Sequence, residues 1–133
     1  MTAPPLLDRA VLDDLIEHLG LDPIRSVVKL FLDESRGYFE TIAKAAAPGS
    51  DPASRDRARR AAHALKSGAG QLGASAIAAA ANAVEEAAGR GAPDLPARIA
   101  ALEAYAENTR AALLAVIGEQ DAPGGAAPRQ GDR

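Results

Sequence analysis

Apolar residues recur at helical spacing along most of this chain, and they divide it into five helical segments. The first segment, over residues 6–19, places Leu12, Leu15, Ile16 and Leu19 at positions i, i+3, i+4 and i+7. This spacing gives one continuous apolar face on an α-helix. Gly20 follows directly and is predicted to end the helix.

A long second helix is predicted from Asp22-Pro23 to about residue 47. Asp22 is expected to cap it, and Pro23 lies in the first turn, where the missing N–H costs nothing. Both phenylalanines and one of the two tyrosines lie on its apolar face, so this helix is expected to supply the bulk of the core. The face comprises Ile24, Val27, Val28, Phe31, Leu32, Tyr38, Phe39 and Ile42.

Three further helices follow the same pattern. Asp51-Pro52 repeats the start signal and opens the third helix, which runs to about residue 72 and closes at Gly73. A fourth helix is predicted over residues 75–88, ended by Gly89 and Gly91, and a fifth over residues 94–117, beginning at Asp94.

The connections between these helices are short, and short links favour antiparallel neighbours. The sequence therefore predicts an all-α fold, an antiparallel up-down four-helix bundle over residues 6–118 that includes an additional short N-terminal helix. Residues 1–5 are expected to be flexible. Residues 119–133 lack periodicity and are rich in Gly, Pro, Asp, Gln and Arg, which is typical of a disordered tail.

Composition agrees with a helical, single-domain protein. The chain has 133 residues, 47% of them apolar but only 3% aromatic, because alanine dominates. Alanine is the best helix former, whereas strands favour aromatic and β-branched residues. The absence of cysteine excludes thiol chemistry, and the net charge of −3 gives no indication of nucleic-acid or membrane binding. Since no signal peptide or membrane-spanning run is seen, the cytoplasm is the expected location.

The third helix carries one of the two histidines, His63, on its polar face. At 100° per residue, a set of polar and small side chains falls within about 60° of His63. The core stripe, including Leu65 and Leu72, lies on the opposite side. The set on the histidine face is Asp56, Arg59, Arg60, Lys66, Ser67 and Gly70.

Phosphoryl transfer is the chemistry that this face suits. An imidazole in its neutral form is a good nucleophile toward phosphorus, and an ordinary histidine side chain is largely neutral at cytoplasmic pH. Lys66, Arg59 and Arg60 would attract a phosphoryl group, and such transfer needs mainly positioning and charge stabilisation. The small residues Ser67 and Gly70 would let the active site of another protein come close.

Other catalytic and cofactor signals are missing from the sequence. There is no phosphate-binding glycine loop after a strand, and no His/Cys/Glu cluster with metal spacing. The adjacent carboxylates Asp13-Asp14 and Glu85-Glu86 would point apart on a helix and are interpreted as solvated faces. His18, one step off its apolar stripe, is interpreted as a surface residue, and spacing alone leaves the same interpretation open for His63.

The run from His63 to Ala74, HALKSGAGQLGA, resembles the signature of the histidine-containing phosphotransfer (HPt) domain, roughly His-x-Leu-Lys-Gly-small-small-x-x-x-Gly-Ala. The resemblance extends over most of the chain, with family-like positions in the first, second and fourth helices. These positions are Val11, Leu12, Leu15, Gly20, Phe31, Leu32, Val84 and Glu85.

The resemblance implies that His63 is the phosphoacceptor and that Lys66 steadies the phosphoryl group. Docking of the partner would involve Arg59, Arg60, Ser67, Gly70 and Gln71, the last of which could orient the ring or the phosphate. Ser67 departs from the glycine that the family usually has after the lysine. This change is expected to affect the choice of partner rather than activity.

The resemblance also implies the partners, which are response-regulator receiver domains and a hybrid histidine kinase. The chain would need no cofactor of its own, because Mg²⁺ would come with the receiver domain. Lacking an ATP-binding module, it would have no ATP-dependent kinase activity, and it is expected to be a monomer.

Two alternatives remain open. The first is a non-catalytic helical interaction module with an incidental surface histidine. The second is a dimerising, histidine-kinase-like bundle, which would need a further exposed apolar face. The sequence disfavours this dimer because every predicted helix uses its stripe within one bundle.

Overall fold

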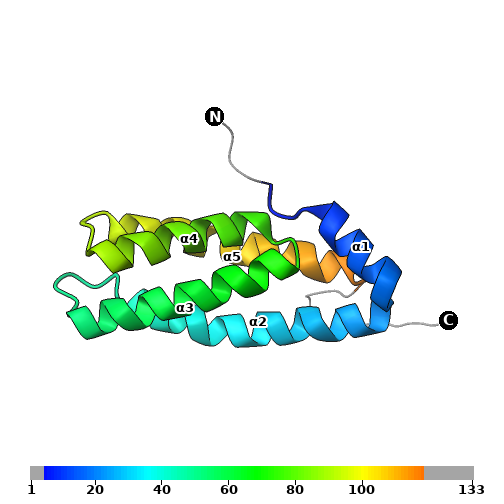
Figure 1. Ribbon diagram of the computed structural model, residues 1–133, viewed down its shortest axis with the longest axis horizontal. Coiled ribbons are helices and arrows are strands. Elements are labelled where there is room, and N and C mark those ends of the chain that lie inside the picture. The colour runs from blue at the N-terminus through cyan, green and yellow to red at the C-terminus, as the bar shows by residue number, and fades with distance from the viewer. Residues whose placement is uncertain (1–4, 119–133) are drawn as a thin grey trace.

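The computed structural model describes residues 5–118, which form five α-helices (Figure 1). Four of them run alternately up and down as a bundle, and the short first helix lies at the end where the second begins. The predicted all-α bundle is thus confirmed. The helices are α1 (Arg9–Leu19), α2 (Leu21–Lys44), α3 (Pro52–Gln71), α4 (Ser75–Arg90) and α5 (Leu95–Val116). The segments expected to be flexible or disordered, 1–5 and 119–133, lie outside the described residues except for Pro5.

The most extensive contact between two helices of the bundle is between α3 and α4. Both helices bury alanines, among them Ala62 and Ala69 of α3 and Ala81 and Ala87 of α4. A methyl side chain lets two helix backbones approach closely, so polar side chains at the rim of the seam can reach across it. The candidate functional site lies on this seam.

The expectation that the second helix supplies the bulk of the core was wrong. The rings of Phe31 and Phe39 are only partly buried against the main cluster, and most buried residues come from α3, α4 and α5. A smaller cluster around Leu12, Leu72 and Leu113 joins α1 to the end of the bundle. The aromatic residues therefore cover the core rather than fill it.

The start of α1 and the start of α2 both differ from the sequence prediction. The first helix begins at Arg9 rather than at residue 6, because the Asp8 side chain accepts a hydrogen bond from the Ala10 N–H at 3.1 Å. Asp22 does not cap α2. Gly20, at φ 92°, turns the chain directly from α1 into α2, and Asp22 in the first turn pairs instead with Arg25 at 2.7 Å.

Gly73 closes α3 as predicted, at φ 76°, and it also anchors α1. Its carbonyl accepts a hydrogen bond from the Asp8 N–H at 2.6 Å. A Cβ at this position would lie 2.8 Å from the Asp8 carbonyl oxygen and 3.0 Å from Cβ of Val11. Only glycine allows the left-handed turn and this close approach together.

The ends of α2 and α4 also differ from prediction. The second helix ends at Lys44 rather than near residue 47, because the Ala45 N–H turns back to the Ile42 carbonyl at 3.0 Å. Helix α4 continues through Gly89 to Arg90 and ends at Gly91, whose φ of 61° is the left-handed conformation that a helix end favours. The backbone hydrogen bonds and conformation at each end therefore set these boundaries, and the presence of a glycine alone does not.

Four large apolar side chains of α1 and α2 remain exposed: Leu19 (58%), Leu21 (39%), Val27 (45%) and Leu30 (56%). Leu19 and Val27 were predicted to belong to the buried stripes, and that prediction was wrong. The bundle therefore leaves part of its apolar stripes exposed. The sequence argument against a dimer, that every helix uses its stripe within one bundle, no longer holds. Among the described helices, none combines the length and hydropathy that crossing a bilayer requires.

Candidate functional site

His63 lies midway along α3, and 59% of its side chain is exposed. Its neighbours Ala62 and Leu65 are fully buried, so the polar face predicted for this helix is confirmed. The imidazole takes no part in the packing of the core, and its ring can be reached from solvent and by another protein.

Glu85 of α4 binds the ring across the seam between the helices. Its Oε2 lies 2.8 Å from Nδ1 of His63, and only 20% of the Glu85 side chain is exposed. A hydrogen bond from Lys66, opposed by partial burial and reinforced by His63, holds the pKa of Glu85 below its usual range. Glu85 is therefore a carboxylate at neutral pH, and it can only accept the hydrogen bond. In the neutral form of the ring, the hydrogen therefore lies on Nδ1 and the lone pair on Nε2.

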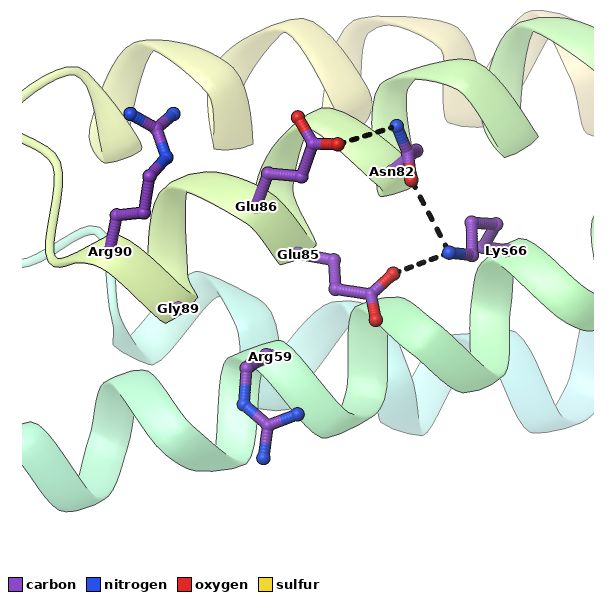
Figure 2. Close-up of a pocket in the computed structure, with 7 residues that line it drawn as sticks. All are labelled: Arg59, Lys66, Asn82, Glu85, Glu86, Gly89 and Arg90. Atoms are coloured by element: carbon purple, nitrogen blue, oxygen red, sulfur yellow. Dashed lines mark hydrogen bonds and ion pairs between the residues drawn. The ribbon is translucent and has the colours of Figure 1, made fainter.

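The same carboxylate positions the lysine. Nζ of Lys66 lies 2.6 Å from Oε1 of Glu85 and donates a hydrogen bond to Oδ1 of Asn82 at 3.3 Å (Figure 2). Asn82 and Glu85 both come from α4, and the Lys66 side chain is 32% exposed. One carboxylate thereby brings the histidine and the lysine together. The furrow beside them is lined by Arg59, Lys66, Asn82, Glu85, Glu86, Gly89 and Arg90.

The two arginines on this face share a carboxylate of their own helix. Asp56 Oδ1 lies 2.9 Å from Arg59, and its Oδ2 lies 2.9 Å from Arg60. The hydrogen bond from Arg59, with the charges of both arginines, lowers the pKa of Asp56. The predicted basic rim is present, but a carboxylate partly neutralises it.

The small residues named from the sequence do different things. Ser67 and Gly70 are exposed, and a Cβ at Gly70 would meet nothing within 4 Å. Gly68 faces inward, where a Cβ would lie 3.2 Å from the Phe31 ring. Gly68 therefore serves the packing of α3 on α2, whereas Gly70 leaves open surface about two helical turns beyond His63.

Gln71 lies about 12 Å along the helix axis from His63, since each residue rises 1.5 Å. It lines an apolar groove between the ends of α1, α2 and α3. The role considered for it, orienting the ring, belongs to Glu85 in the structure. The groove is lined by Leu15, Leu19, Ile24, Val27, Leu30, Phe31, Glu34, Gly68, Gln71 and Leu72.

Sequence reasoning missed Glu85 as a site residue. It interpreted Glu85-Glu86 as a solvated pair, which holds for the exposed Glu86 but is wrong for Glu85. The available signal was the family-like position Val84-Glu85. The register that sets Glu85 against His63 depends on how α4 packs on α3, which one sequence does not reveal.

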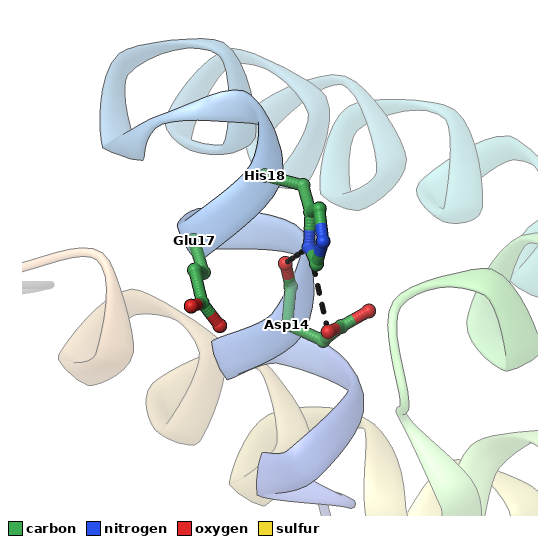
Figure 3. A group of neighbouring side chains, drawn as sticks. All are labelled: Asp14, Glu17 and His18. Atoms are coloured by element: carbon green, nitrogen blue, oxygen red, sulfur yellow. Dashed lines mark hydrogen bonds and ion pairs between the residues drawn. The ribbon is translucent and has the colours of Figure 1, made fainter.

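One cluster among the described residues could geometrically hold a metal ion, and it lies on α1 away from His63. Asp14, Glu17 and His18 place their ligand atoms within 4.8 Å of one another, and all three are exposed (Figure 3). Nδ1 of His18 donates to the Asp14 carbonyl at 2.8 Å, so this nitrogen is not available as a ligand. The interpretation of His18 as a surface residue agrees with this geometry.

Comparison with known proteins places the fold and the site in context. The Hpt domain family model matches residues 26–112 of the chain. The crystal structure of histidine-containing phosphotransfer protein B (HptB) from Pseudomonas aeruginosa PAO1 is similar, with a TM-score of 0.73 and 27% identity. That match covers 85% of this chain and 95% of the other. No curated protein sequence gives a significant match.

Proposed function

Because this chain belongs to the Hpt domain family and so has a histidine phosphotransfer role in a phosphorelay, we propose that His63 is its phosphoacceptor. In this proposal, a receiver-domain phosphoaspartate donates the group, and a second receiver aspartate accepts it. The observation that carries the assignment is the exposed ring whose Nδ1 is held by Glu85 at 2.8 Å.

The two transfers balance without an external acid or base. The Nε2 lone pair of His63 attacks phosphorus, the P–O bond of the phosphoaspartate breaks, and the electron pair returns to the carboxylate. In the second transfer a receiver carboxylate attacks phosphorus, and the P–N bond electrons return to Nε2. The hydrogen on Nδ1 stays in place throughout.

Lys66 is the group of this chain that stabilises the phosphoryl oxygens in this proposal. It lies one helical turn from His63, and Glu85 and Asn82 hold its ammonium group beside the ring. A positioned cation lowers the energy of a transition state in which negative charge spreads over phosphoryl oxygens. Mg²⁺ would come from the acidic pocket of the receiver, and ATP-dependent kinase activity would belong to the partner kinase.

The receiver domain would dock over His63 and along α3 as far as the apolar groove that Gln71 lines. Val27 and Leu30 are about half exposed on α2, and Gly70 leaves the end of α3 open. An apolar patch beside charged groups is typical of a protein interface, in which the charges tune the association rate more than the affinity. Arg59 and Arg60 would form the charged rim. The expected monomer and cytoplasmic location stay predictions.

Transfer from a phosphorylated receiver domain in the presence of Mg²⁺ tests the proposal. The chain has two histidines, so His63→Gln and His18→Gln form a matched pair. Acid-labile, base-stable label should appear on the wild type and His18→Gln and be absent from His63→Gln. Equal labelling of His63→Gln would contradict the proposal, and unchanged relay function of that variant would favour a non-catalytic interaction module.

A further inference from the structure

Glu85 serves the nucleophile and the cation at the same time. It projects from α4, whereas His63 and Lys66 both lie on α3, and its two oxygens are used separately. Oε2 lies 2.8 Å from Nδ1 of His63, and Oε1 lies 2.6 Å from Nζ of Lys66. A neutral amide in this position could hold the ring, but it would carry no charge.

That charge matters most after the phosphoryl group has arrived. When Nε2 forms its bond to phosphorus and Nδ1 keeps its hydrogen, the ring carries a positive charge. A ring in this form leaves phosphorus as neutral imidazole, because the P–N electron pair returns to Nε2. If Nδ1 had lost its proton, imidazolate would have to leave, and this anion is a far poorer leaving group. A carboxylate against Nδ1 favours the protonated form.

Glu85 has the largest effect on the charge of the ring, because the other charged groups nearby are paired with one another or do not contact the ring. Cations disfavour a positively charged ring, but Lys66 is paired with Glu85, and Asp56 pairs with both Arg59 and Arg60. Among the described residues, the carboxylate in contact with the ring is that of Glu85. The remaining charged groups at the furrow are Glu86 and Arg90 of α4.

We propose that Glu85 is a positioning residue that poises the phosphorylated protein to give its phosphoryl group away rather than to store it. Its carboxylate retains the proton on Nδ1 of phosphorylated His63 and so keeps imidazole ready to leave as a neutral ring. This inference rests on the proposed function of His63.

The test compares the wild type with Glu85→Gln, and with Glu103→Gln as a matched control that removes the same charge at an exposed position of α5 outside the furrow. All three are phosphorylated with phosphoramidate, and loss of the phosphoryl group to a receiver domain is followed by ³¹P NMR across neutral and alkaline pH. Glu85→Gln should transfer about tenfold more slowly than wild type at about pH 8, with a smaller difference at about pH 6. Glu103→Gln should follow the wild type.

A readout on the unphosphorylated protein separates this role from a structural one. The ¹⁵N shifts of the His63 ring should show the hydrogen on Nδ1 in the wild type and a mixture of tautomers in Glu85→Gln. Identical transfer profiles for Glu85→Gln and the wild type would overturn the inference while leaving His63 as the acceptor. So would a wild-type ring with its hydrogen on Nε2. A wild type that takes no phosphoryl group on His63 would overturn the proposed function and this inference together.

Discussion

Nδ1 of His63 and Oε2 of Glu85 lie 2.8 Å apart, although 22 residues separate them in the chain. The contact spans α3 and α4, the pair of helices with the most extensive contact in the bundle. Rigid packing of small residues behind a functional side chain fixes its position better than a loop would. The orientation of the imidazole therefore depends on the alanine-rich core beneath it.

Replacing Lys66 with alanine should slow phosphoryl transfer by about 10-fold to 100-fold, because one positioned cation is lost from the transition state. Lys66→Arg should retain more activity, since it keeps the charge near Glu85. Single-turnover transfer from a phosphorylated receiver measures both rates. An unchanged rate for Lys66→Ala would show that the receiver supplies all the charge that the reaction needs.

Stability should fall as the pH is lowered through the acid range. The pKa of Glu85 is lowered in the fold, chiefly by its hydrogen bond from Lys66, relative to an ordinary value of 4.5. A carboxyl group of this kind contributes its stability above the ordinary value and loses it as the pH falls through the lowered one. The pKa values of Asp51 and Asp56 are lowered too, from 3.8.

Urea unfolding at a series of pH values measures this effect. Stability should be level near neutrality and decline below about pH 4.5. Glu85→Gln should decline less steeply over the same range, because the ionisation of that side chain is gone. A variant with the same slope as the wild type would assign the acid sensitivity to the other carboxyl groups.

Gly70→Ala should stabilise the fold more than Gly68→Ala does. Alanine is favoured over glycine inside a helix by about 1 kcal/mol, and a Cβ at Gly70 meets nothing within 4 Å. Gly70→Ala should therefore stabilise the fold by about 0.5–1 kcal/mol. At Gly68 the Phe31 ring, 3.2 Å from the new Cβ, would have to shift, which offsets the gain.

The same pair distinguishes packing from docking. If Gly70 lies under the receiver, Gly70→Ala should weaken binding of a receiver domain while raising the thermal midpoint. Isothermal titration and thermal unfolding of one preparation give both quantities. Tighter or unchanged binding by Gly70→Ala would place the interface elsewhere.

Leu30→Asp should weaken receiver binding by about 1–2 kcal/mol without unfolding the bundle. Leu30 is 56% exposed and lines the apolar groove, so its replacement removes contact area rather than core. Leu21→Asp is the matched control, because Leu21 is also exposed on α2 and is not among the groove residues. Equal losses for both variants would argue against the groove as the docking surface.

The sequence was sufficient for the architecture because its signals are local. The periodic stripes and the pairs Asp51-Pro52 and Leu72-Gly73 depend on a few neighbouring residues, and the structure places helix ends close to them. Asp22 failed as a cap for an equally local reason. Gly20 leaves a single residue between two helices, so Asp22 falls inside the first turn.

The contacts between side chains of different helices could not be predicted from the sequence. The exposed position of His63 follows from periodicity, but the pairing of Glu85 with both His63 and Lys66 depends on the rotation and register of α4 against α3. Val27 is exposed because it lines the groove between α1, α2 and α3, whose width depends in the same way on how these helices pack. A single sequence fixes which face of a helix is apolar, and it leaves open how far the neighbouring helix reaches.

The most direct test of the central claim locates the phosphoryl group on the atom that the geometry assigns. The protein, labelled with ¹⁵N in its histidine rings, is incubated with a phosphorylated receiver domain and Mg²⁺ and studied by ³¹P and ¹⁵N NMR. The structure predicts phosphorus bonded to Nε2 of His63, with the hydrogen on Nδ1. A phosphoryl group on Nδ1 or on His18, or a chain that stays unmodified, would contradict it.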